Sequence, residues 1–492
     1  MLPPLIRRAR KNVGPGSRQR GFTMALVAIS MVAIISMAAL SIDLGTLYEA
    51  KAEAQRAADA AALAAAQVIS TSGITGDPGN SGNSWQPACG GSTSLATLAA
   101  INVANQNLIG GNAPSTVTVN YGTSSGVGTI TDCTGAGAAF AVNPVVQVYV
   151  QQAKLPTFFA RIFSLIPGGT FSNSGVSATA AAEAFNPSGT STSTMIPVQP
   201  RCVKPWMVPN QDPGNGSCSG TCPPFVNAST GALGTAGIST SGVIGETFTL
   251  TVDCGFSGRR RSLPCTLANQ PQANIAPKTL NYVPGQVSSP SVAIAANSSI
   301  SACSEAKTND YAEAVAGCDQ STVYACGVSG AGNKVDLTED PGPPRNDSVN
   351  AAACLINAGG SGLDQGQDLL VPDGAPPYSY PFQINAGTNS AMLTAGITGL
   401  AKDSQITSSP SIVSVPIYDS TTLINPTGTT AVTIVGFLQV FINSVDSTTG
   451  NITVTVMNVA GCGNAVGSGT TPVYGTSPVP VRLITPPVAA TP

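Results

Sequence analysis

Histidine is absent from all 492 residues of the chain. Its absence excludes a Ser-His-Asp triad and a Cys-His nucleophile pair, and it removes a main ligand of catalytic zinc sites. Charge is scarce too, since Asp, Glu, Lys and Arg make up only 9% of the residues and aromatic residues only 5%. With 53 Gly and 38 Pro, this composition is typical of exposed strands and loops, not of a cytosolic enzyme.

Cysteine is missing from the first 88 residues, whereas 12 cysteines lie between Cys89 and Cys462. This one-sided distribution predicts disulfides in an oxidising compartment. A zinc site at Cys218 and Cys222 is the competing interpretation, but it would need a second pair of ligands, and no histidine exists to supply one. The sequence does not determine the pairing. Short separations make three pairs the first to test, namely Cys218 with Cys222, Cys254 with Cys265, and Cys318 with Cys326.

Catalytic and nucleotide-binding motifs are missing as well. The chain has no Gly-x-x-x-x-Gly-Lys-Ser/Thr loop. Its basic cluster at 259–261 has no interleaved aromatic residues, which argues against nucleic acid as a partner. Close carboxylates such as Asp364 and Asp368 are typical of solvated loops or of a weak calcium site. We therefore predict no enzyme activity, no cofactor and no metal, with an anchored hydrolase using Asp364 and Asp368 as the enzyme alternative.

One long hydrophobic run stands near the N-terminus. Residues 21–42 carry no charged side chain, and a helix needs about 20 apolar residues to cross a bilayer. Six Lys or Arg and no acidic residue precede the run, whereas four acidic and two basic residues follow it within 43–59. The positive-inside rule then places residues 1–20 in the cytoplasm and the chain after residue 42 outside. A cleaved signal peptide is the alternative, but its apolar region is about 7 to 15 residues long.

The helix is predicted to continue outside the bilayer over residues 43–70. This stretch is rich in Ala, Leu, Gln and Glu and repeats small residues at near-helical spacing. Its narrow alanine face suits close packing against another helix. Asp59 could contact such a partner helix; the alternative is that it lies on a solvated face and pairs with Arg56. For Asp43 the two interpretations are a functional ion pair or pilin-type contact, and a helix residue at the boundary of the lipid headgroups. The residues expected to pack or to contact a partner are Asp43, Gly45, Tyr48, Gln55, Ala58, Asp59 and Ala62.

The predicted fold class is α+β. An α/β head at 71–187 follows the long helix, with helices at 95–106 and 155–165 and strands at 116–121, 145–150 and 176–185. Residues 188–400 hold nine cysteines and little periodicity, so we predict an irregular region in which disulfides compensate for a thin core. Within it we expect a strand at 247–252 and helices near 309–316 and 347–357.

The C-terminal part is predicted to be rich in strands. Residues 401–470 contain three strand patterns, at 411–415, 431–442 and 451–457. The second is almost continuously apolar and is therefore predicted to lie centrally in a sheet. The Pro-rich residues 471–492 are predicted to form a flexible tail.

The N-terminal motifs carry a family resemblance. The Arg20-Gly21 junction, the uncharged span, Ile-Asp-Leu-Gly-Thr-Leu-Tyr at 42–48 and the alanine-rich 54–66 resemble the N-terminal region of TadG-like proteins of the bacterial Flp pilus (Tad) assembly system. Residues 156–161 and 176–184 are similar to the pilin-like head of that group. The resemblance implies an assembly or minor-pilin-like protein in the bacterial inner membrane, with its bulk in the periplasm or at the cell surface. Its partners would be other pilin-like subunits or the Tad machinery.

Two departures qualify the resemblance. Gly21 and Phe22 resemble a prepilin cleavage junction, but the fifth residue after the glycine is Leu26, where true pilins carry a glutamate that pairs with a neighbour's N-terminal amine. This difference argues against ordinary polymerisation. The metal motif of the von Willebrand A domain, found in some relatives, is also missing. The alternative function is a surface adhesin whose β-rich region at 195–470 binds carbohydrate or protein.

Overall fold

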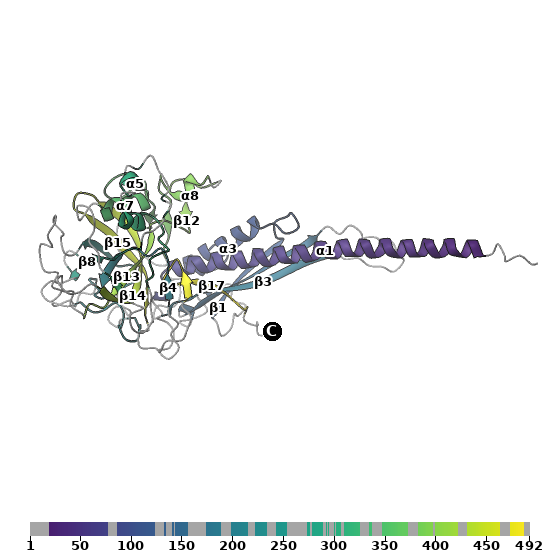
Figure 1. Cartoon of the computed structure of the whole chain (residues 1–492), viewed down its shortest axis with the longest axis horizontal. Coiled ribbons are helices and arrows are strands. Elements are labelled where there is room, and N and C mark those ends of the chain that lie inside the picture. The colour runs from purple at the N-terminus through teal and green to yellow at the C-terminus, as the bar shows by residue number, and fades with distance from the viewer. Residues whose placement is uncertain are drawn as a thin grey trace, which may run out of the picture.

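A long helix carries two lobes in the computed structural model, a smaller one along its second half and a larger one at its C-terminal end (Figure 1). The structure describes residues 19–76, 86–123, 132–133, 140–141, 143–155, 174–187, 198–214, 222–233, 243–252, 273–275, 278–288, 292, 294, 300, 302–306, 309–324, 334–336, 347–371, 382–396, 399–421, 431–462 and 473–486.

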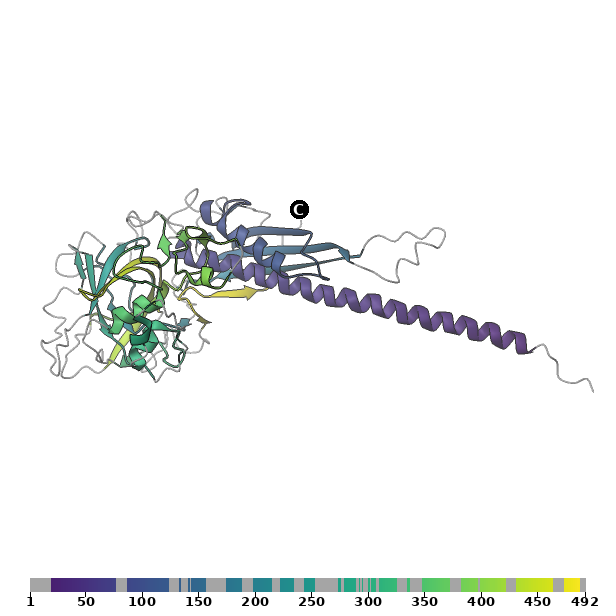
Figure 2. The same cartoon turned by 90° about the horizontal axis from the view of Figure 1, so that it is seen from above.

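Helix α1 (Gln19–Thr71) runs without interruption for 53 residues, or about 80 Å at 1.5 Å per residue. The prediction that the apolar run continues as a helix to about residue 70 is confirmed. Glycine at position 45 does not break it. Figure 2 shows the first half of α1 leaving the lobes as a rod, while the second half lies on a sheet.

The smaller lobe is a four-stranded antiparallel sheet covered by helices. Its strands follow the order β1 (Thr116–Thr123), β2 (Pro144–Leu155), β3 (Ser174–Ala184) and β17 (Val481–Ile484). The second half of α1 packs on β2 and β3, beside α3 (Leu95–Gln106), α2 (Gln86–Cys89) and the short helix η1 (Ile74–Gly76). The predicted helix at 95–106 and all three predicted strands are confirmed. The helix predicted at 155–165 lies outside the described residues, apart from Leu155, which ends β2.

Strand β17 corrects the prediction of a flexible tail at 471–492. Its residues pair with β3, and Arg482 forms an ion pair with the buried Glu183 opposite it. A second short strand, β16 (Val473–Gly475), pairs with β4 (Val198–Pro200). Next to the β3–β17 pair, the N–H of Phe185 donates to the carbonyl of Pro480 over 2.9 Å. Because β3 and β17 are neighbours in the sheet and the larger lobe lies between them in sequence, that lobe is an insertion into the smaller one.

The larger lobe is built on a mixed sheet whose strands close into a ring. The order is β13 (Ile412–Tyr418), β5 (Trp206–Pro209), β8 (Lys278–Pro284), β6 (Thr247–Val252), β15 (Asn451–Gly461) and β14 (Ala431–Asp446), and β14 pairs again with β13. Two short strands, β9 (Lys334–Asp336) and β7 (Ala273–Ile275), pair with β14 and β8. The predicted central position of the 431–442 strand is confirmed, because β14 pairs with three strands.

Helices α5 (Ala302–Glu305), α6 (Asp310–Ala316) and α7 (Asp347–Leu355) pack together beside this sheet. Asn309 caps α6 by accepting the N–H of Ala312 over 2.8 Å. A small sheet of β10 (Leu369–Leu370), β11 (Ile384–Asn385) and β12 (Gln405–Ile406) and the one-turn helix α8 (Ala391–Thr394) complete the lobe.

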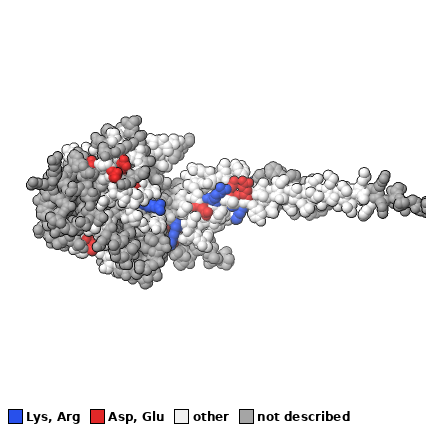
Figure 3. All heavy atoms as spheres, viewed as in Figure 1, with Lys and Arg blue, Asp and Glu red and all other residues white. Residues whose placement is uncertain are grey.

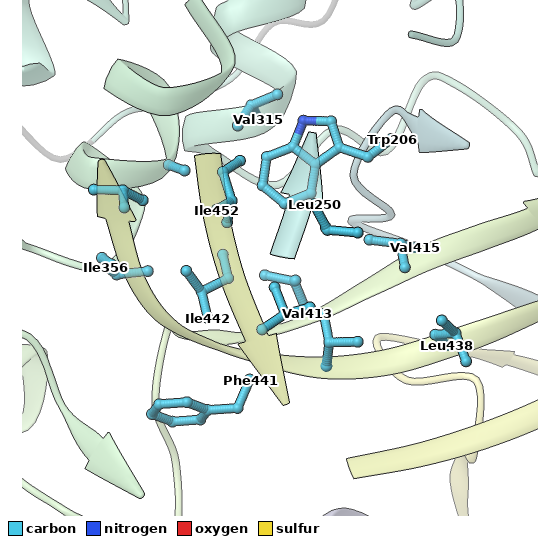
Figure 4. Packing of buried hydrophobic residues seen from close by; sticks show 14 of the residues in the cluster. Trp206, Leu250, Val315, Ile356, Val413, Val415, Leu438, Phe441, Ile442 and Ile452 are labelled. Atoms are coloured by element: carbon cyan, nitrogen blue, oxygen red, sulfur yellow. The ribbon is translucent and has the colours of Figure 1, made fainter. Parts of the chain in front are cut away.

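One hydrophobic core spans the larger lobe. Trp206 and Leu250 belong to the same buried cluster as Ile442 and Ile452, and Figure 4 shows these side chains gathered between the strands. The boundary expected at residue 400 falls inside this cluster. The described part of 188–400 therefore shares one core with the strands after residue 400, instead of having a thin core of its own.

Candidate assembly interface along the first helix

The first half of α1 exposes its apolar side chains. From Phe22 to Ile42 the large hydrophobic side chains are 52–78% exposed. The Oγ of Ser30 donates to the carbonyl of Val27 over 2.9 Å, and the Oγ of Ser36 to that of Val32 over 2.8 Å. The helix thus satisfies these hydroxyls by itself, as an apolar solvent requires. Among the described helices, α1 alone is long and apolar enough to cross a membrane.

The second half of α1 buries an alanine face inside the smaller lobe. Seven alanines between residues 54 and 66 are fully buried, and they pack with the valines of β2 and the alanines of β3. The small side chains bring the helix close to the sheet and to α3. Ala58 and Ala62 therefore pack within this chain.

The other predicted contact residues fall into two groups. Gln55 is turned toward the sheet, where its Nε2 donates to Asp59 Oδ1 over 2.8 Å and to the carbonyl of Thr179 over 3.4 Å. The described ion pairs do not include Asp59 with Arg56. Tyr48 is 70% exposed, and a Cβ added to Gly45 would meet nothing within 4 Å, so this face is open in the described structure. Contact of these residues with a partner stays a prediction.

Asp43 stands at the end of the apolar half. It is only 3% exposed, although its helical neighbours Ile42 and Leu44 are about half-exposed. A buried carboxylate needs polar or charged partners, so the side chain is held by the fold and not presented at the surface. Sequence reasoning selected Asp43 but did not predict its burial.

A belt of charged side chains marks where α1 enters the smaller lobe. Figure 3 shows blue and red groups gathered there, whereas the visible helix toward the N-terminus is white. Lys51 Nζ donates to the carbonyl of Ser177, and Glu53 Oε2 accepts the N–H of Gly110 over 2.7 Å. A cavity of about 270 Å³ lies beside Glu49 and Glu53. Polarity thus changes abruptly between Ile42 and Glu49, as it does at a membrane surface.

Buried hydrogen bonds fix the larger lobe to the end of α1. Asn458 Nδ2 donates to the carbonyl of Ser70 and to Thr75 Oγ1, each over 2.9 Å. Asn186 Nδ2 donates to the carbonyls of Thr75 (3.2 Å) and Val459 (3.0 Å). Gly73, at φ +85°, has the left-handed conformation that ends helices. A Cβ there would lie 2.7 Å from Ile244 Cγ2, so the junction also requires glycine for space.

Each lobe contains at least one disulfide of its own. Three pairs lie in the described part of the chain, namely Cys89 with Cys133, Cys202 with Cys318, and Cys303 with Cys354. Cys222 and Cys462 are disulfide-bonded as well. The pairing of Cys318 with Cys326 is therefore wrong, because the fold brings Cys318 to a cysteine 116 residues away. Cys218, Cys254, Cys265 and Cys326 lie outside the described residues.

The carboxylates of the hydrolase alternative have structural partners. Asp368 is buried and accepts the Ser409 hydroxyl over 2.6 Å and the N–H of Gly387 over 3.1 Å. Asp364 is exposed and forms an ion pair with Lys402 over 3.4 Å. The described residues contain no group of three His, Cys, Asp or Glu that could hold a metal ion.

Two ionisable groups, the half-buried Glu246 and the buried Lys204, were not singled out from the sequence. Burial and the neighbouring Asp212 carboxyl raise the pKa of Glu246 to about 9. Burial lowers the pKa of Lys204 to about 7, and Asp319 opposes this shift. No sequence pattern marks either residue, since their burial results from strands that pair over long distances.

The two-sided character of α1 coincides with a family match. Residues 21–68 match the family model described as "Putative Flp pilus-assembly TadE/G-like". The TadE/G-like segment contains both the exposed apolar half of α1 and almost all of its packed half. Neither the curated proteins nor the solved structures give a match to the chain.

The match confirms the TadG-like resemblance of the N-terminal region. It connects the chain with Flp pilus assembly, which is a structural role, and together with the apolar helix it supports membrane association. The TadE/G-like segment ends three residues before α1 does. It therefore includes the part of α1 that packs in the smaller lobe, and the rest of both lobes lies outside it.

Proposed function

We propose that this chain is a membrane-anchored assembly protein of Flp-type (Tad) pilus biogenesis that acts through helix packing and protein contacts. The observation that carries the proposal is the division of α1 into an exposed apolar half and a buried alanine half within the TadE/G-like segment. The first half holds the protein in the bilayer, and the second half forms the spine of a head outside it.

The proposed topology has the N-terminus in the cytoplasm and both lobes on the far side of the bacterial inner membrane. The six basic residues before the apolar half support this orientation. The disulfides support it as well, because such bonds persist outside the reducing cytoplasm.

We further propose that α1 with the β1-β2-β3-β17 sheet is a pilin-like head. In support, the helix spine lies on one face of an antiparallel sheet. The larger lobe is then an insertion that gives this head its specific contacts. The proposed partners are other pilin-like subunits or the membrane-bound Tad machinery.

Ile34→Arg tests the proposal in the source bacterium. An arginine near the helix centre costs about 2.5 to 3.5 kcal/mol on insertion, so the variant should leave the membrane fraction, and pili should be lost. Ile34→Leu is the matched control and should retain both. Normal piliation with the Ile34→Arg protein absent from the membrane would contradict the proposal.

The adhesin alternative assigns the ligand to the larger lobe. Cells that lack the protein would then form normal pili but lose attachment to a surface. Loss of the pili themselves favours the assembly proposal.

A further inference from the structure

The bridge between Cys202 and Cys318 is the most accessible of the three disulfides that lie wholly within the described part of the chain. Cys318 is exposed and Cys202 is half-buried. By contrast, all four cysteines of the other two bridges are at most 5% exposed. Because thiol–disulfide exchange depends on access to the sulfur atoms, burial protects those two bridges but not the first one.

A cavity of about 410 Å³ borders the accessible bridge where the last turns of α1 meet the larger lobe. Both Cys202 and Cys318 line it, together with Gln67 and Thr71 of α1. None of the described lining residues carries a carboxylate, which would repel an approaching thiolate anion. A small thiol therefore has room to approach the bridge from the cavity as well as from the surface at Cys318.

The backbone at Cys202 is strained. Its φ is +58°, in the left-handed region that residues with a β-carbon seldom adopt. Breaking the bridge allows this residue to relax. Strained or exposed disulfides are reduced more readily than buried structural ones, and this bridge is both strained and exposed.

Other contacts hold the two bridged segments together. The N–H of Cys202 donates to the carbonyl of Asp319 over 3.1 Å. The buried side chain of Lys204 reaches the end of α6, where its Nζ donates to the carbonyls of Gly317 (2.5 Å) and Ala314 (3.4 Å). The bridge can therefore open without unfolding the lobe, and its two thiols stay near enough to close it again.

We propose that Cys202 and Cys318 form a thiol–disulfide exchange site, which an external thiol opens reversibly while the two buried bridges stay closed. The external thiolate forms a bond to Sγ of Cys318, the more exposed cysteine. The Cys202–Cys318 bond breaks, and its electron pair leaves on Cys202 as a thiolate, which the positive charge of the adjacent Arg201 favours. A second external thiolate then displaces Cys318, so two thiolates become one disulfide and the bridge becomes two thiolates.

Opening the bridge frees the segment between β4 and β5 from the end of α6, beside the cavity at α1. The external thiol is either a small molecule of the glutathione kind or a dithiol protein, since both attack through a thiolate. Neither a membrane nor a pilus is needed for the reaction, so the purified protein is sufficient to test it.

The test uses the full chain, purified in detergent without reductant. Reduced glutathione and reduced thioredoxin are added to separate samples, each sample is trapped with iodoacetamide at increasing times, and peptide mass mapping follows each cysteine. We expect Cys202 and Cys318 to be modified at least tenfold faster than Cys303 and Cys354, with the first glutathione adduct on Cys318. Oxidised glutathione should afterwards restore the original bridge. In a urea concentration that unfolds the lobe, the difference in rate should disappear.

Comparison of the two reductants identifies the source of the thiol. Faster opening by glutathione indicates a small thiol, and faster opening by thioredoxin indicates a dithiol protein. The proposal fails if Cys303 and Cys354 react as fast as Cys202 and Cys318 in the folded protein, or if neither reductant opens the Cys202–Cys318 bridge until the lobe unfolds. A first adduct on Cys202 would overturn the direction of attack. No residue is replaced, so the result does not depend on the folding of a variant.

Discussion

The Asn458 side chain of β15 donates to the carbonyl of Ser70 in the last turn of α1 over 2.9 Å. It thereby connects the C-terminal end of α1 with the sheet of the larger lobe, 388 residues later in the chain. This bond is buried, and Asn186 and Thr75 extend it into a network. The larger lobe is consequently held in a defined position relative to α1.

Asn458→Leu removes the centre of that network. It leaves the Ser70 carbonyl and the Thr75 hydroxyl buried without this partner, so we expect a loss of about 1 to 3 kcal/mol in the free energy of unfolding. Urea unfolding of the purified protein measures it. Asn112→Ala, which changes an exposed asparagine of the smaller lobe, should cost less than about 0.5 kcal/mol. Equal costs for the two variants would show that the network does not hold the lobes.

Ala58→Leu tests the alanine face of α1. Ala58 is fully buried in the smaller lobe, so the larger leucine side chain should lower the free energy of unfolding by about 1 to 3 kcal/mol, which lowers the melting temperature. The exposed Ala52 lies on the same helix, and Ala52→Leu should leave the melting temperature nearly unchanged. If Ala52→Leu were the more damaging of the two, the orientation of α1 on the sheet would be wrong.

Much of the fold could be predicted because its signals are local. Helix α3 and strand β6 begin and end as the residue patterns predict, and the apolar run of β14 correctly indicated a central strand. Strand β17 was missed since its four residues follow a Pro-rich stretch and pair with β3, about 300 residues earlier. The insertion and the ring of strands were missed for the same reason. The partner of Cys318 depends on this long-range pairing as well.

The candidate site, too, could be predicted where its signals are local and was missed where they depend on distant parts of the chain. The apolar half of α1 follows from its uncharged run, and the alanine face follows from periodicity, which is why Ala58 and Ala62 could be selected. The burial of Asp43 and that of Lys204 could not be predicted, because neighbours distant in sequence create both environments.

Disulfide mapping of the non-reduced protein should find Cys202 joined to Cys318 and Cys303 joined to Cys354. The second bridge closes a separation of 51 residues between α5 and α7, for which the chain-entropy estimate is about 4 kcal/mol. Replacing both of its cysteines by serine should therefore lower the melting temperature clearly. A peptide that links Cys318 to Cys326 would contradict the described fold around α6.

Glu246 should make stability depend on pH. Its pKa is raised from 4.5 to about 9 by burial and by Asp212, so between these values the folded state keeps a proton that the unfolded state releases. Stability from this group is greatest below pH 4.5 and declines as the pH rises toward 9. Glu246→Gln should reduce the loss of stability between pH 5 and pH 9 in urea unfolding. The exposed Asp310 provides the control variant Asp310→Asn, and an unchanged pH profile in Glu246→Gln would refute the assignment.

The most direct test of the account is the topology of α1 in intact cells. Single cysteines are introduced at Asn12 and at Tyr48, on either side of the apolar half, and spheroplasts are treated with a membrane-impermeant maleimide. Tyr48→Cys should be labelled at once, and Asn12→Cys should be labelled only after the membrane is permeabilised. Labelling of Asn12→Cys in intact spheroplasts, or protection of Tyr48→Cys, would contradict a helix that anchors the protein with its head outside.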